Sequence, residues 1–246
     1  MFMSVKEIDR AIAFAWVLFA AAWPNLGAGS AFAGEIQIKC DGAHRMDPLA
    51  ITKVTLGNSP VQCGLVVSPT QLQPVIPIQA GDDWLQNLTL YVLNRTNKTI
   101  VFSHIRLSFP ETGDGKSTPQ VVYYITLGRI PASVAFTRAG TPIRQAPSQQ
   151  AIQFASGQTL PVQVGNYFDM IKASVERVMP FTSVTKCNIR MDLSYFDDGT
   201  KFSGVSYWAP DPQHPGNFTE LDRKTYFPGI PSWPPGYSTW PPKAGN

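Results

Sequence analysis

The chain has 246 residues, a length that favours one sizeable domain with additional segments. Charged residues make up only 15%, and 19 glycines and 22 prolines are present, so coiled coils, helical bundles and highly charged disordered chains are excluded. The net charge of +3 is small and scattered along the chain, and it gives no support to nucleic-acid binding.

Residues 1–33 have the pattern of an export signal. Lys6 and Arg10 form a basic start, residues 11–23 are apolar, and Ala31-Phe32-Ala33 is a small-x-small cleavage motif. The uncharged stretch that follows the basic start is long enough to cross a bilayer, so a retained membrane anchor is the alternative. The proline and glycines that break this stretch favour cleavage, which predicts a secreted or periplasmic bacterial protein.

Three cysteines, Cys40, Cys63 and Cys187, share the strand parity of apolar neighbours and are all expected to face the core. An oxidising compartment permits one bridge and leaves one thiol. The short intervening loop favours a Cys40–Cys63 disulfide, and a bridge from either residue to Cys187 is the alternative. Neither a CxxC motif nor enough histidine accompanies the cysteines, so no zinc site is expected.

Short apolar runs separated by glycine, proline and asparagine predict many β-strands after the signal. The alternation is clearest in residues 88–92 and 101–109, which flank a polar turn and predict a hairpin. Further strands are expected at residues 121–127, 152–154 and 160–164.

One helix, at about residues 166–179, interrupts the strands. Four apolar residues with helical spacing define its expected buried face: Phe168, Ile171, Val175 and Val178. Asn166 is expected to cap the start of this helix, and Pro180 is expected to end it.

The clearest local prediction is a hairpin over residues 189–208. The first arm alternates between apolar and polar residues, and Asp198-Gly199 is the dipeptide preferred in a two-residue type I′ turn. That turn would place Tyr195 opposite Phe202 and the two ends of the segment opposite each other.

Aromatic residues are the candidates for a contact surface. The predicted hairpin puts Trp208 on the apolar face and Tyr207 on the exposed polar face. Trp233 and Trp240 lie in residues 228–246, a tail rich in proline and tryptophan that is expected to be irregular or disordered. Tyr207, Trp233 and Trp240 are therefore the predicted contacts for a protein or glycan partner.

Many short strands, little helix and inward cysteines indicate a mainly β fold. The prediction for residues 34–227 is an antiparallel immunoglobulin-like β-sandwich, with the helix at about 166–179 as a crossover. A small β-barrel is the alternative.

A series of short motifs follows in order along residues 82–216. They are Asp82-Asp83-Trp84-Leu85, Asn87-Leu88-Thr89, Asn94 with Lys98 and Ile100, Phe109-Pro110-Glu111-Thr112, Val175-Glu176, Phe196-Asp197-Asp198-Gly199-Thr200 and Asp211-Pro212. Taken together, this order resembles a group of secreted bacterial proteins to which no function is assigned. The resemblance implies a bacterial exported protein, supplies no catalytic residue, and ends before the proline-rich tail.

Candidate catalytic chemistry is sparse. The only histidines are His44, His104 and His214; His104 is expected on the exposed face of a strand and His214 in a loop. The pairs Asp82-Asp83 and Asp197-Asp198 have the chemistry of calcium ligands, but turn formation is the favoured interpretation of both. No nucleophile-elbow, metalloprotease or phosphate-loop motif is present, so no catalytic residue, cofactor or metal site is assigned.

These observations predict an exported, non-catalytic binding or structural module of the bacterial envelope or extracellular space. The partner is an unknown protein or glycan, not a nucleic acid, and a membrane only if the N-terminal segment is retained. The alternatives are a carbohydrate-active or other hydrolase that uses loop carboxylates, and a membrane-anchored envelope protein. Two carboxylates, or a histidine–carboxylate pair, converging in one concave pocket would favour the hydrolase.

Overall fold

The computed structural model describes residues 34–41, 47–61, 64–68, 71–72, 77–114, 118–145, 149–204 and 206–221. The chain divides into two units, residues 1–33 and 34–246, and all described residues belong to the second. The predicted signal peptide and the predicted tail both lie outside the described residues. In the described part of the chain, no helix is long and apolar enough to cross a membrane.

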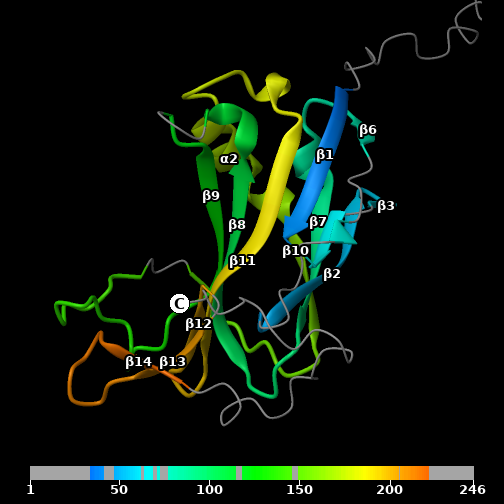
Figure 1. Ribbon diagram of the computed structural model, residues 1–246. Helices are drawn as coiled ribbons and strands as arrows, with labels where there is room; N and C mark the ends of the chain where they lie inside the picture. The colour runs from blue at the N-terminus through cyan, green and yellow to red at the C-terminus, as the bar shows by residue number, and fades with distance from the viewer. Residues whose placement is uncertain are drawn as a thin grey trace, which may run out of the picture. The chain divides into compact units, whose positions relative to one another are not determined.

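Two β-sheets make up most of the described structure (Figure 1). The larger sheet holds ten strands: β1 (Gly34–Asp41), β4 (Gly64–Ser68), β5 (Gln71–Leu72), β6 (Ile78–Ala80), β8 (Ile100–Phe109), β9 (Val121–Gly128), β11 (Lys186–Phe196), β12 (Lys201–Ser203), β13 (Ser206–Pro210) and β14 (Phe218–Glu220). The smaller sheet holds β2 (Leu49–Leu56), β3 (Ser59–Val61), β7 (Leu88–Asn94) and β10 (Thr159–Gln163). The fold is mainly β, as predicted, and the described strands form no closed barrel.

The larger sheet is organised around β11. This strand pairs antiparallel with β8 and parallel with β1, and β8 pairs on its other side with β9. The pairing of β1 with β4 is parallel as well, whereas the smaller sheet is antiparallel in the order β10-β7-β2-β3. The predicted hairpin of residues 88–92 with 101–109 is wrong, because β7 and β8 belong to different sheets. Alternation reports which face of a strand is buried, and it does not report the partner strand.

One hydrophobic core connects the two sheets. Buried side chains of β1, β8 and β11 in the larger sheet and of β2 and β7 in the smaller sheet belong to a single cluster. On β7, Leu88, Leu90 and Val92 are completely buried while the residues between them are half-buried. This is the period-two pattern predicted from the sequence.

The predicted helix is shorter than expected. A 3-10 turn, η3 (Val164–Tyr167), continues directly into α2 (Phe168–Val175). Phe168 and two further apolar residues of the predicted face are buried, whereas Val178 lies beyond the helix and is 51% exposed. Asn166 makes no capping hydrogen bond because it lies inside the 3-10 turn. Pro180 precedes the next 3-10 turn, η4 (Phe181–Ser183).

The chain does fold back after β11, but the predicted register is wrong by one residue. Tyr195 lies opposite Lys201, and Ser194 lies opposite Phe202. The Phe196 N–H donates to the Thr200 carbonyl at 2.9 Å, which leaves a three-residue turn in place of the predicted two-residue turn. Gly199, which ends this turn, takes the left-handed conformation at φ +82.

The second arm of the predicted hairpin is also shorter than expected. After three residues of β12 the chain turns again at Gly204, whose φ is +69, and β13 pairs back onto β12. Trp208 consequently lies opposite Lys201, and the predicted pairing of Ile189 with Trp208 is wrong. Ile189 instead pairs with Leu107 of β8.

Candidate functional site

Tyr207, predicted as a contact residue, lies in the core. Its side chain is 1% exposed, and its ring stacks on Phe196 at 6.1 Å and packs against Phe202 at 5.0 Å between centroids. The predicted exposed position is wrong, because the extra turn after β12 changes the register and so reverses which side chains face inward. The other two predicted contacts, Trp233 and Trp240, lie outside the described residues.

The structure describes one free cysteine, Cys187, and leaves the predicted Cys40–Cys63 bridge as a prediction. Cys187 is free and fully buried in β11, which leaves no bridge to this residue. Burial raises the pKa of its thiol far above the ordinary value, and the nearby Glu111 carboxylate adds to the rise, so the thiol is no nucleophile at neutral pH. The Cys40–Cys63 bridge stays a prediction because Cys63 lies outside the described residues. The parallel pairing of β1 with β4 favours it, since Gly64, which directly follows Cys63, lies opposite Lys39.

The acidic pair at residues 197–198 forms a turn. Asp198 Oδ2 lies 2.5 Å from Lys98 Nζ, and its Oδ1 accepts the N–H and O–H of Thr200 at 3.0 and 2.6 Å. Partial burial raises the pKa of Asp198, but the hydrogen bonds from Lys98 and Thr200 outweigh this effect and hold the pKa below its ordinary value. The carboxylate is therefore already engaged in structural contacts. Among the described residues, no group of three or more histidine, cysteine or acidic side chains gathers as a metal site would require.

Neither of the two described histidines meets a carboxylate in a cavity. His104 is half-buried, with its ring 4.7 Å from that of Phe102 and 5.5 Å from that of Tyr124. Burial lowers its pKa, and the Asp192 carboxylate offsets this only in part, so the imidazole is neutral at pH 7. His214 Nδ1 does lie 2.9 Å from an Asp211 oxygen, but on an exposed loop. His44 lies outside the described part of the chain.

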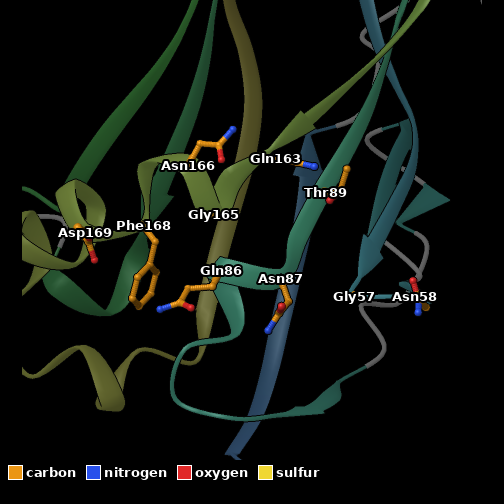
Figure 2. A pocket seen from close by; sticks show the side chains of 10 residues that line it. All are labelled: Gly57, Asn58, Gln86, Asn87, Thr89, Gln163, Gly165, Asn166, Phe168 and Asp169. Carbon is orange, nitrogen blue, oxygen red and sulfur yellow. The ribbon is translucent and has the colours of Figure 1, made fainter.

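A cleft of about 540 Å³ lies where two 3-10 turns meet, at one end of the smaller sheet (Figure 2). The first turn is η1 (Trp84–Asn87), which leads into β7, and the second is η3, which follows β10. Because β7 and β10 are antiparallel neighbours, with Thr89 opposite Gln163, the start of one strand lies beside the end of the other. The strand pairing therefore places the two turns side by side.

Gly165 permits the close approach of these turns. A Cβ atom at this position would lie 2.2 Å from the Gln86 carbonyl oxygen, so no other residue fits without moving the backbone. The turn between β2 and β3 provides a further wall, and there the Gly57 N–H donates to the Asn87 carbonyl at 2.8 Å. The start of α2 provides Phe168 and Asp169.

Side-chain amides dominate the described lining of the cleft. Five of them surround the space, all exposed: Asn58, Gln86, Asn87, Gln163 and Asn166. None forms a side-chain hydrogen bond with any other residue that the structure describes. Each amide offers two donors and one acceptor oxygen, Thr89 adds a hydroxyl and Asp169 adds one carboxylate. None of the lining residues that the structure describes is cationic. This chemistry matches a neutral ligand that has both hydrogen-bond donors and acceptors.

No binding role was predicted from the sequence for any residue of the cleft. The ten lining residues come from three separate stretches of the chain, and asparagine and glutamine at strand ends are also ordinary turn composition. The available signal was Gly165 at a strand-to-helix junction, where a conformationally free residue indicates a close backbone contact.

No protein-family model matches this chain, and neither a curated protein nor a solved structure is significantly similar to it. The family implied by the motifs of residues 82–216 thus remains an expectation.

Proposed function

We propose that the chain is an exported, non-catalytic binding module that holds a neutral, hydroxyl-rich ligand, such as a glycan, in the amide-lined cleft. The observation that carries this proposal is that five side-chain amides without a hydrogen-bond partner among the described residues line one cleft. Sugar hydroxyls donate and accept hydrogen bonds at the same time, and an amide side chain complements both roles. Export is supported by the signal pattern of residues 1–33, and membrane anchoring through this segment is the alternative.

The composition of the cleft favours binding over the hydrolase alternative. Glycoside hydrolysis in its common form needs a pair of carboxylates about 5–10 Å apart. Among the described residues that line the cleft, Asp169 is the only carboxylate and no histidine accompanies it. The immunoglobulin-like character of the two-sheet fold is part of the same proposal, since such sandwiches commonly serve as binding scaffolds.

A titration of the secreted protein with neutral oligosaccharides tests the proposal by calorimetry. Gln86→Ala and Asn166→Ala each remove hydrogen bonds to the ligand, so each is expected to weaken binding by about tenfold. The matched control is Asn97→Ala, which removes an exposed amide that lies outside the cleft. The proposal fails if no neutral oligosaccharide binds, or if the cleft and control variants bind equally well. Release of reducing sugar that is lost in Asp169→Asn would instead establish the hydrolase.

A further inference from the structure

Two arginines face each other on the larger sheet, on the side away from the core. Arg106 of β8 is directly paired with Arg190 of β11. The residues that flank them, Ile105 and Leu107 on β8 and Ile189 on β11, are completely buried, so both arginines project from the opposite face. Like charges directly opposite each other destabilise a sheet unless something compensates for them.

No ion pair compensates for this repulsion among the side chains that the structure describes. Neither arginine forms an ion pair or a side-chain hydrogen bond in the described part of the chain. The Arg106 Nε is shielded from solvent and has no acceptor, which is costly for a charged donor. Asp192, the next residue of β11 on this face, forms no ion pair with either arginine. Its carboxylate instead acts on His104, where it partly offsets the lowering of the pKa by burial. Asp41 of β1 lies opposite Arg190 in the backbone register, but its side chain is not among those that the structure describes.

Further unused donors adjoin the arginine pair. Ser108 and Asn188 lie opposite each other, one pair farther along the same face of β8 and β11. Neither side chain has a hydrogen-bond partner among the residues described. On the other side of Arg106 lies Tyr124 of β9, whose side chain is 43% exposed.

We propose that Arg106, Arg190, Ser108 and Asn188 form a second binding site, which takes an oxyanion group: a carboxylate, sulfate or phosphate. Such a group would lie between two guanidinium ions, accept hydrogen bonds from their terminal N–H groups and cancel the repulsion of the pair. The hydroxyl and the amide supply neutral donors, and Tyr124 provides an apolar side. None of the four residues lines the cleft, so this site does not depend on the proposed function.

The direct test is an NMR titration of the ¹⁵N-labelled secreted protein with inorganic phosphate at constant ionic strength. The Nε–Hε resonance of Arg106, assigned by its disappearance in Arg106→Gln, is expected to shift in a saturable manner. The Nε–Hε resonance of Arg177, an exposed arginine beyond the end of α2, serves as the internal control. The proposal is overturned if the Arg106 resonance shifts no more than the Arg177 resonance.

Two variants separate a binding role from a structural one. Arg190→Gln is expected to weaken phosphate binding by about tenfold, and Arg177→Gln is expected to leave it unchanged. Without the anion and at low salt, Arg190→Gln is expected to unfold at the wild-type temperature or higher, because it removes like-charge repulsion. A lower unfolding temperature of Arg190→Gln together with an unchanged phosphate affinity would show that Arg190 has a structural role, and it would contradict the proposal.

The source of the oxyanion is resolved by comparing two carboxylate probes, acetate and oligogalacturonate. Tighter binding of the oligomer that requires both arginines would identify an acidic polymer. Equal affinity per carboxylate would identify a small free anion. If neither of these probes nor phosphate binds, the proposed site is contradicted.

Discussion

The side chain of Asn94 stabilises the segment through which the chain passes from β7 of the smaller sheet to β8 of the larger sheet. Its Nδ2 donates to the Lys98 and Phe154 carbonyls, at 2.8 Å each. Its Oδ1 accepts the N–H of Thr96 at 3.0 Å and the hydroxyl of Thr96 at 2.8 Å. The side chain is completely buried, so all of its hydrogen-bonding capacity is used inside the protein.

Asn94→Ala is expected to lower the free energy of unfolding by about 2–4 kcal/mol, because it removes every hydrogen bond of a fully buried side chain and leaves the Thr96 N–H without its acceptor. Urea denaturation followed by fluorescence measures this change. Asn97→Ala, at an exposed position three residues farther along, is the control and should stay within about 0.5 kcal/mol of the wild type. A loss of stability at Asn94 no larger than the control would show that water replaces these contacts.

The burial of single residues could be predicted from the sequence where apolar and polar residues alternate along a strand. The inward positions of Cys40 and Cys187 are confirmed, as both side chains are completely buried. The predictions for Tyr207 and Trp208 were wrong, because they depended on a register extrapolated across two turns. A shift of one residue moves every later side chain of the strand to the opposite face. An error in the length of a turn therefore makes the predicted burial of the residues after it wrong.

At the scale of elements, the contact between η1 and η3 shapes the cleft. Gly165→Ala is expected to lower the free energy of unfolding by about 1–3 kcal/mol, because its Cβ would overlap the Gln86 carbonyl. The two turns would also move apart, so the affinity for any cleft ligand should fall. Thermal denaturation and ligand titration measure the two effects. The neighbouring variant Asn166→Ala adds no atom to this contact and should leave stability unchanged; equal unfolding temperatures for both variants would contradict the role given to Gly165.

Element types were more predictable than element partners. The strands at residues 88–92, 101–109 and 121–127 and the helix near 166–179 are present, since each depends on a local hydrophobic period. Which strands pair depends on contacts far apart in the chain, and the hairpin predicted for the first two strands is accordingly absent. The cleft was missed for the same reason, because its residues come together only after the sheet has formed.

For the whole molecule, the sequence predicts an exported chain with one disulfide and one thiol. Mass spectrometry of the secreted protein is expected to show an N-terminus at Gly34 and a Cys40–Cys63 bridge. Cys187 should resist alkylation until the protein is denatured, because its thiol is completely buried and its pKa is raised. Rapid labelling of Cys187 in the native protein, or its recovery in a bridged peptide, would contradict this assignment.

The position of β1 inside the larger sheet has a consequence for synthesis. This first described strand pairs with β4 on one side and with β11, about 150 residues later, on the other. A growing chain that has not yet reached Lys186 leaves one long edge of β1 open, however complete its earlier strands are. Folding to completion must therefore wait until most of the polypeptide has been made, an order of events well suited to a chain that is threaded through a translocation channel before it folds.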